Sequence, residues 1–279
     1  MPTNDSQSPT TRRSVIRAGA LAAAGSLIVP RLSWAEGPVV PPARTPRLVV
    51  RRSEDRGRAR HGGWLDARFT FSFSRYRDPR HMGFRALRVM NEDRISGGGG
   101  FPMHPHDNME ILTYVLSGSL KHRDSLGGGG IIKPGDTQRM SAGTGIRHSE
   151  FNPSARETTH LLQIWMLPSR RGLRPSYEQK RYATTRTRGQ LQLLASPTRR
   201  QDSVLIQSNL ELYGANLAPR EAVDWTIRRG RHVWIQVARG SLQIGRTALK
   251  QGDGVRSSDP GKLRIVAREN AEFLLFDLA

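Results

Sequence analysis

Short apolar runs separated by turn-forming residues cover the chain from Leu48 onward. The intervals are rich in Gly, Pro, Asp and Asn, and no long stretch has the period of an amphipathic helix. Runs of this length with such borders are typical of β-strands, so the pattern predicts an all-β fold. In the first half of the chain the runs lie at residues 69–73, 84–90, 111–116, 131–132 and 161–167. Two runs of four glycines, 97–100 and 127–130, are expected in loops or hairpin turns.

The predicted strands fall into two blocks of similar size. The second block has apolar runs at residues 190–194, 203–207, 210–217, 232–238, 241–244 and 273–278. Its only histidine is His232, so it offers no cluster of metal ligands. We expect a duplicated barrel in which the second copy has no metal site. The expected boundaries are a linker at 36–47, a first domain at 48–170, a polar linker at 171–182 and a second domain at 183–279.

The first 35 residues have the features of an export signal. Arg12 and Arg13 lie in a segment similar to the twin-arginine signal, an apolar stretch follows at 18–29, and residues 33–35 form a small-x-small cleavage site. The apolar stretch is shorter than the roughly 20 residues that span a bilayer. An uncleaved anchor or a disordered tail is the alternative. We expect export by the twin-arginine translocase, cleavage after Ala35 and a periplasmic location.

Composition narrows the chemistry that the chain can perform. The 279 residues include no cysteine, which excludes disulfides, thiolate ligands and a cysteine nucleophile. Removal of the leader leaves 244 residues, which is enough for one large or two medium domains. The formal net charge is +20, or about +17 without the leader. A basic surface attracts anionic partners, but no nucleic-acid-binding motif is visible, so we expect no specific nucleic-acid partner.

The candidate chemistry lies in two short pairs, His104 with His106 and His148 with Glu150. Residues two apart on a strand point to the same face, about 6.6 Å apart. Two such strands facing across a small barrel would direct three imidazoles and one carboxylate at one point. Such a ligand set accepts a divalent ion of Fe, Mn, Ni, Cu or Zn. Glu110 shares the parity of His104 and His106, so spacing alone leaves Glu110 and Glu150 open as the carboxylate ligand.

Two further histidines have weaker claims. His160 lies in a predicted strand and is expected in the core or lining a pocket, not as a fifth ligand. His122 lies two residues before Asp124 and close to a turn, so it is expected to make structural hydrogen bonds.

The chain resembles the pirin family of the cupin superfamily, and bacterial pirin-like proteins in particular. The resemblance runs from about residue 48 to the C-terminus, densely in the first block and more loosely in the second. The segments that carry it are residues 60–66, 70–73, 82–89, 104–106, 109–116, 122–127, 140–150, 163–165, 233–237 and 274–278.

This resemblance implies a bicupin, in which two consecutive jelly-roll β-barrels form a monomer with one metal ion in the N-terminal barrel. Carried over residue by residue, the metal ligands are His104, His106, His148 and Glu150. The resemblance therefore selects Glu150 over Glu110. A carboxylate ligand can also take a proton from a substrate, which would give Glu150 a catalytic role as well.

Some members of the pirin family have quercetin 2,3-dioxygenase activity, and animal relatives take part in iron-dependent regulation of transcription factors. The resemblance thus implies a metal-dependent dioxygenase that uses O2 on a flavonol-type, quercetin-like or other enolic small molecule. Folding in the cytoplasm before export would favour Fe(2+) as the metal. The alternative is a non-enzymatic metal-binding or regulatory protein of the family, and O2 uptake in the presence of a flavonol would separate the two.

Overall fold

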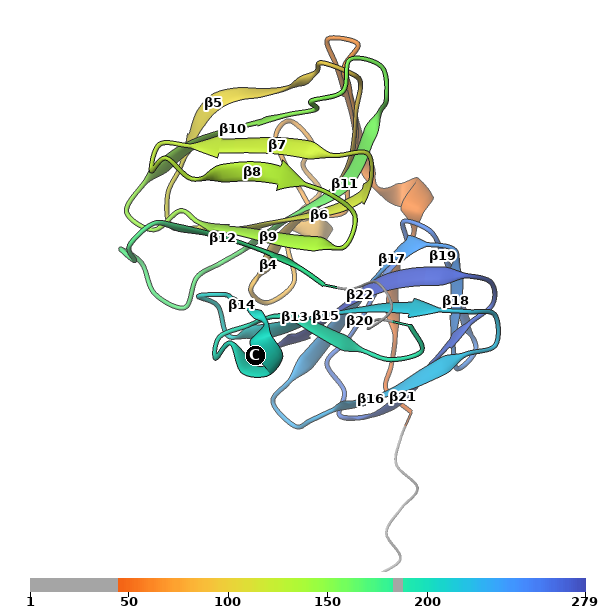
Figure 1. The fold of residues 1–279 in the computed structure, drawn as a ribbon. Helices are drawn as coiled ribbons and strands as arrows, with labels where there is room; N and C mark the ends of the chain where they lie inside the picture. The colour runs from red at the N-terminus through yellow and green to blue at the C-terminus, as the bar shows by residue number, and fades with distance from the viewer. Residues whose placement is uncertain (1–44, 183–187) are drawn as a thin grey trace, which may run out of the picture. The chain divides into compact units, whose positions relative to one another are not determined.

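The computed structural model describes residues 45–182 and 188–279, and the expected leader at 1–35 lies outside this range. The described residues form four sheets, two of seven strands and two of four (Figure 1). One sheet of each size builds each barrel, so the predicted all-β, two-barrel architecture is confirmed. The helices in this part of the chain are short 3-10 helices, Ser53–Asp55, Pro79–His81 and Arg200–Asp202. None of its helices is long and apolar enough to cross a membrane.

In the N-terminal barrel the strand orders are β12-β9-β6-β11-β4-β3-β2 and β5-β10-β7-β8, and all paired strands are antiparallel. The larger sheet consists of β2 Gly57–His61, β3 Leu65–Phe69, β4 Leu87–Ile95, β6 Glu110–Ser117, β9 Asp136–Ser141, β11 Thr159–Met166 and β12 Ser176–Arg181. The smaller sheet consists of β5 Gly100–His106, β7 Leu120–Asp124, β8 Gly129–Ile132 and β10 Ile146–Phe151.

The C-terminal barrel repeats this plan with the orders β1-β20-β17-β22-β15-β13-β14 and β16-β21-β18-β19. Its larger sheet consists of β1 Val49–Arg51, β13 Gln192–Ser196, β14 Val204–Leu205, β15 Leu210–Leu217, β17 His232–Arg239, β20 Gly254–Ser257 and β22 Ala271–Leu278. Its smaller sheet consists of β16 Ala222–Ile227, β18 Ser241–Ile244, β19 Thr247–Lys250 and β21 Gly261–Ala267.

Strand β6 shows how a seven-stranded sheet comes to be buried on both faces. Alternate side chains of a strand point to opposite faces. Ile111 and Val115 pack inside the N-terminal barrel, whereas Leu112, Tyr114 and Leu116 pack toward the C-terminal barrel. A strand that is apolar at nearly every position can therefore serve two cores.

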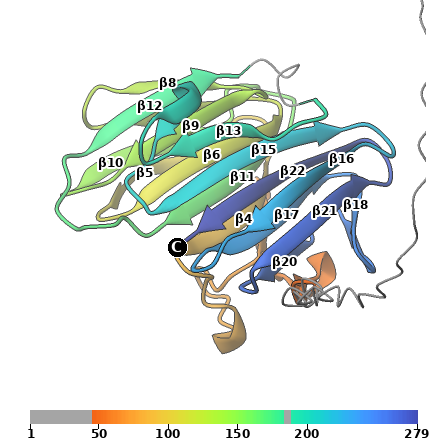
Figure 2. The same ribbon diagram turned by 90° about the horizontal axis from the view of Figure 1, so that it is seen from below.

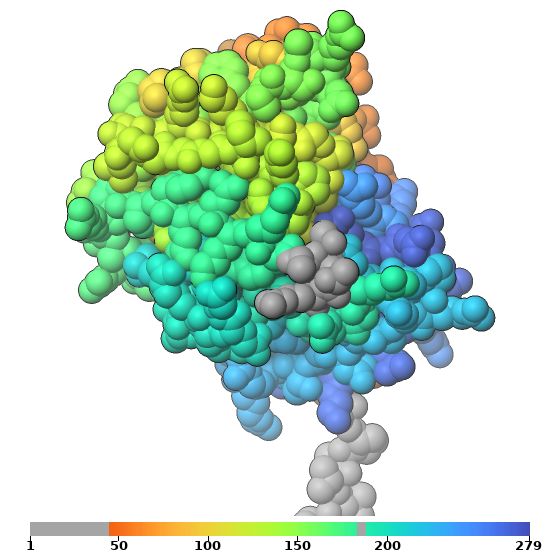
Figure 3. All heavy atoms as spheres, viewed as in Figure 1, coloured from red at the N-terminus to blue at the C-terminus, as the bar shows by residue number. Residues whose placement is uncertain are grey.

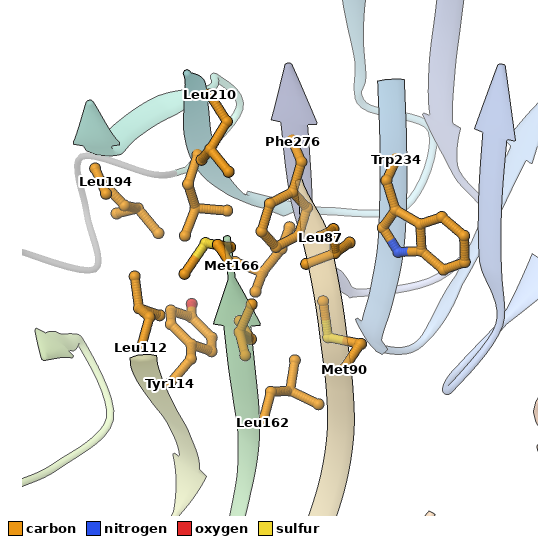
Figure 4. Packing of buried hydrophobic residues seen from close by; sticks show 14 of the residues in the cluster. Leu87, Met90, Leu112, Tyr114, Leu162, Met166, Leu194, Leu210, Trp234 and Phe276 are labelled. Carbon is orange, nitrogen blue, oxygen red and sulfur yellow. The ribbon is translucent and has the colours of Figure 1, made fainter. Parts of the chain in front are cut away.

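The outward faces of the two seven-stranded sheets form one shared hydrophobic core (Figure 4). Figure 2 shows β13, β15, β22 and β17 of the C-terminal sheet side by side, and Figure 3 shows the two barrels in close contact. Burial of one large apolar side chain contributes roughly 1.5–3 kcal/mol, so this core joins the barrels firmly. The labelled residues are Leu87, Met90, Leu112, Tyr114, Leu162 and Met166 from the N-terminal barrel and Leu194, Leu210, Trp234 and Phe276 from the C-terminal barrel.

The first described strand belongs to the second barrel. β1 pairs with β20, and the backbone N–H of Ser53 donates to Oδ1 of Asp253 at 2.7 Å. The sequence predicts residue 48 as the start of the first domain, whereas the structure assigns β1 to the C-terminal sheet. The physical reason is apolar contact, because Leu48 and Val50 pack against the C-terminal core.

The segment 171–182, predicted as a linker, contains strand β12, which pairs with β9 at the edge of the N-terminal sheet. The linker prediction is wrong here because the strand is polar on both faces. On one face Tyr177 packs against His122 inside the barrel. On the other face Glu178 forms an ion pair with Arg139. A strand beside a polar interior lacks the apolar alternation that identifies strands in a sequence.

Both glycine runs extend from a turn into a strand. Gly100 begins β5, and Gly129 and Gly130 begin β8, so the loop prediction is correct for only part of each run. At Gly100 a Cβ atom would lie 2.4 Å from the carbonyl oxygen of Glu150. Glycine at this position therefore lets β5 approach β10 closely.

Candidate metal centre

Three neighbouring strands of the smaller N-terminal sheet carry the candidate site. β10 lies between β5 and β7, and His148 is directly opposite His104 on one side and Asp124 on the other. Opposite residues of antiparallel neighbours point to the same face. The prediction that the two ligand strands face each other across the barrel is therefore wrong. They are hydrogen-bonded neighbours, and their side chains converge because they share a face.

Three imidazoles meet on this face. Nε2 of His104 lies 3.0 Å from Nε2 of His148, and the ring of His106 lies 4.8 Å from both rings, centroid to centroid. Nδ1 of His104 donates to the carbonyl of Pro102 at 2.8 Å, which leaves its Nε2 with a free lone pair. Nε2 of His106 is buried and has no hydrogen-bond partner among the described residues. Converging lone pairs and an orphaned buried nitrogen are the arrangement that a bound cation satisfies.

Burial keeps two of the imidazoles in the form that binds metal. It lowers the pKa of His148 to about 3, with help from the neighbouring His104 and His122. It lowers the pKa of His106 to about 4, again reinforced by the other two imidazoles. Both rings are therefore neutral at pH 7, and a neutral imidazole is the metal-ligating form.

Glu150 lies beside this cluster rather than within it. The three imidazoles form one group of potential ligand atoms, and Glu150 forms a second, overlapping group with His148 and His122. The β5–β10 register shifts between His148 and Glu150, so that Glu150 pairs with Phe101 and has no histidine of β5 opposite it. Nε2 of Gln163 donates to both carboxylate oxygens at 2.9 Å. The structure thus brings the four predicted ligands to one region, with the carboxylate held by an amide.

Gln163 is itself oriented by a hydroxyl. Thr113 Oγ1 donates to Oε1 of Gln163 at 3.2 Å, which turns the amide nitrogen toward Glu150. Residues 113 and 163 are directly opposite on β6 and β11, on the barrel's inner face. The larger sheet therefore fixes a carboxylate that the smaller sheet supplies.

Glu110 lies on the opposite face of β6 from Thr113. Its oxygens accept from the hydroxyl of Ser141 at 2.5 Å and from the backbone N–H of Gln207 at 3.0 Å. The parity argument that admitted Glu110 is wrong because β5 ends at His106 and a turn with left-handed Asn108 precedes β6. Side chains alternate between the two faces only within one strand. Residues on either side of a turn therefore cannot be assigned to one face by counting.

His160 and His122 lie in different surroundings. Nε2 of His160 is 2.8 Å from a Glu92 oxygen, and the other oxygen of Glu92 accepts from Arg56, so His160 belongs to a separate ion-pair network. His122 lies 3.3 Å from Asp124, which confirms its predicted structural hydrogen bond, and it is also buried against His148, a contact that sequence reasoning missed. The available signal was spacing, because His122 and Asp124 repeat the two-residue interval of the predicted ligand pairs.

Among the described residues, groups of potential metal ligands occur in the N-terminal barrel only. The interiors of the two barrels explain this difference. The C-terminal interior is filled by apolar side chains from both of its sheets, among them Tyr213, Ile235, Leu263 and Phe273. In the N-terminal barrel the groups of potential ligands lie among two smaller apolar clusters. A surface cavity of about 420 Å³ opens beside His106 and is lined also by Pro105, Asp107, Ser125, Gly145, Ile146 and Arg147.

Asp93 on β4 is a buried carboxyl whose Oδ1 has no partner among the described residues. Burial raises its pKa from 3.8 to about 8, and the charges of Glu150 and Glu92 add to the effect. An unfolded chain loses this proton near pH 3.8, whereas the folded chain keeps it to about pH 8. The group therefore costs stability increasingly as pH rises through this window.

Asp93→Asn removes the titration while keeping the side chain's shape. We expect the Tm of the variant minus that of the wild type to increase between pH 5 and pH 8.5, measured on metal-free protein. Asp224→Asn, on the exposed face of β16, is the matched control. A Tm difference for Asp93→Asn that stays constant over this pH range would contradict the prediction.

A metal-ligand cluster in the first of two β-barrels, with an apolar second barrel, defines a two-barrel metal-binding protein. The family described as Pirin matches residues 50–166, and the family described as Quercetinase C-terminal cupin domain matches residues 193–278. A curated relative from Escherichia coli strain K12, named quercetin 2,3-dioxygenase, is 46% identical over 231 residues, covering 83% of this chain and 98% of the relative. The chain belongs to the pirin family, and the predicted bicupin fold is confirmed.

Two solved structures support the same family assignment. The crystal structure of YhhW from Escherichia coli is 45% identical with a TM-score of 0.80, covering 84% of this chain and 98% of that one. Another structure, of bacterial pirin YhhW in complex with nickel(II), is 46% identical with a TM-score of 0.79, covering 83% and 99%. The nickel complex of the relative and the ligand cluster of this chain together support a divalent metal. The names of the relatives support an oxidoreductase.

Proposed function

We propose that this chain is a metal-dependent dioxygenase that acts with O2 on a flavonol-type, quercetin-like or other enolic small molecule. The observation that carries the proposal is the convergence of three imidazoles beside a buried, amide-held carboxylate, next to an open cavity. The name of the 46% identical relative supports the same reaction class.

The proposed metal ligands are His104, His106, His148 and Glu150, with Fe(2+) as the native metal and Mn, Ni, Cu or Zn as metals that the same donors accept. A divalent metal held by these residues would supply Lewis-acid and redox chemistry at this position. A surface cavity adjoins His106, and a small molecule would approach the centre from there.

The chain's own residues would prepare the substrate. A flavonol carries an acidic enolic hydroxyl, and its oxidative ring cleavage requires that this proton be removed. Glu150 shares a group of potential ligand atoms with His148, so it would accept the proton while Gln163 holds its orientation. Arg147 lines the cavity mouth and would attract the resulting enolate anion.

O2 uptake tests the proposal directly. Protein reconstituted with Fe(2+) or Ni(2+) should consume O2 and release carbon monoxide when given quercetin. A flavone that lacks the 3-hydroxyl should support neither, because it has no proton for Glu150 to take. His104→Ala, which removes a proposed ligand, is the control for protein-bound catalysis. Tight metal binding without any turnover would favour the non-enzymatic metal-binding or regulatory alternative.

We also propose that the protein is exported by the twin-arginine translocase and acts as a monomer in the periplasm. This proposal rests on Arg12 and Arg13 and on the apolar and small residues that follow them. These residues lie outside the part of the chain that the structure describes.

A further inference from the structure

We infer that Asp124 and His122 are positioning residues that fix the tautomer and orientation of His148 for metal binding. The inference rests on the ligand set of the proposed function, and extends it to two residues outside that set. It starts from the register of two neighbouring strands. Asp124 lies opposite His148, and His122 lies opposite Glu150, so four polar side chains of β7 and β10 share the barrel's inner face.

The contacts among these side chains form a chain that ends at the imidazole cluster. Nδ1 of His148 lies 3.5 Å from Nδ1 of His122, and Nε2 of His122 lies 3.3 Å from Oδ2 of Asp124. At the other end, Nε2 of His148 faces Nε2 of His104 at 3.0 Å. The two nitrogens of His148 thus face different partners, the metal-binding cluster on one side and His122 on the other.

One assignment of protons satisfies every contact in this chain. If Nε2 of His148 keeps its lone pair for a metal, its Nδ1 carries the proton and donates to Nδ1 of His122. Nε2 of His122 then carries a proton and donates to the carboxylate of Asp124. The opposite assignment would place the proton of His148 on Nε2, pointing at the other imidazoles, and would leave a lone pair of His122 against a carboxylate.

Asp124 is held in place by the turn that follows it. Its Oδ1 accepts from the backbone N–H groups of Leu126 and Gly128, both at 2.9 Å, which leaves Oδ2 for His122. A Cβ atom on Gly128 would lie 2.6 Å from Oδ2, so glycine makes room for the carboxylate. The turn therefore sets the direction of the acceptor before any metal is present.

His122 is held equally firmly. Its side chain is buried, and its ring packs against Tyr177 with centroids 4.9 Å apart. Tyr177 is fixed in turn because its hydroxyl donates to Oε1 of Gln179 at 2.7 Å. A histidine that is locked on its face and bonded at both nitrogens is suited to orient a ligand. Partners of this kind commonly contribute about 10- to 100-fold in metal affinity.

The test measures Zn(2+) and Ni(2+) affinity by competition with a chelator, with neither flavonol nor O2 present. His122→Leu should weaken binding about 10- to 100-fold, with the stoichiometry at saturation unchanged. His122→Gln, whose amide both accepts and donates, should recover part of the loss. Asp124→Asn keeps the shape but turns an N–H toward His122, which favours the wrong tautomer, so affinity should fall as in His122→Leu. His160→Leu, which removes a histidine outside the cluster, should leave affinity unchanged.

A spectroscopic readout separates positioning from mere structural support. In the Zn(2+)-loaded wild type, nitrogen-15 NMR of the histidine rings should show Nδ1 of His148 protonated and Nε2 metal-bound, with no nitrogen of His122 on the metal. Asp124→Asn should alter the His122 and His148 signals together. Unchanged affinity in His122→Leu and Asp124→Asn would overturn the inference, as would a metal-bound nitrogen on His122.

The outcome is independent of the dioxygenase proposal. A protein without flavonol turnover that shows these affinity losses supports the positioning pair and contradicts the proposed reaction. If His122→Leu does not fold, His122→Gln and Asp124→Asn carry the test. If His104→Ala binds metal as tightly as the wild type, the proposed centre itself is wrong, and the positioning role is wrong with it.

Discussion

Replacement of Glu150 by alanine is expected to remove most of the metal and the O2 uptake, whereas replacement of Glu110 should retain both. The loss at Glu150 should exceed about 10-fold in metal affinity, since even partners beyond the ligands commonly contribute that much. The reason for the difference is where the two carboxylates lie. Glu150 shares a group of potential ligand atoms with His148, while Glu110 lies on the outer face of β6. Metal content and flavonol-dependent O2 uptake are the measurements.

Each variant has its own secondary signature. Glu110→Ala leaves the hydroxyl of Ser141 and the backbone N–H of Gln207 without their acceptor, so its Tm should fall even though the metal stays. His104→Ala is the positive control for metal loss. If Glu110→Ala empties the centre while Glu150→Ala keeps it, the proposed ligand set is wrong at the carboxylate.

Lysine in place of both Arg12 and Arg13 is expected to abolish export. The change preserves charge but removes the planar guanidinium groups that distinguish a twin-arginine signal. The protein should accumulate in the cytoplasm with its leader attached, as shown by fractionation and by the mass of the N-terminal peptide. Arg31→Lys, in the same leader but outside the pair, should be exported normally. An undiminished periplasmic yield of protein that begins at Glu36 would rule the prediction out.

The fold class could be predicted because most strands carry a simple signal. Runs such as residues 111–116 are apolar on both faces, and turns rich in glycine and aspartate separate them. The converging histidines could be predicted for the same reason, since spacing of two on a strand guarantees a shared face. What spacing does not contain is how strands are arranged. From the spacing we expected the two ligand strands to face each other across the barrel, but in the structure they are hydrogen-bonded neighbours.

Two other errors have one physical origin, which is that local sequence does not record tertiary environment. β12 was missed because it is polar on both faces, one packed inside the barrel and the other ion-paired with Arg139. Glu110 was admitted because parity was carried through a turn that resets it. Each depends on which strands become neighbours, and only long-range packing decides that.

The placement of β1 has a consequence for how the protein can be made. A ribosome synthesises β1 about 200 residues before its partner β20, so β1 has no strand to pair with until β20 has been made. The N-terminal half alone would expose the apolar outer face of its larger sheet, and the C-terminal half alone would lack β1. Neither half is a self-sufficient fragment. Final assembly must therefore wait until both barrels have been synthesised, with pairing between β1 and β20 among the slow steps of folding.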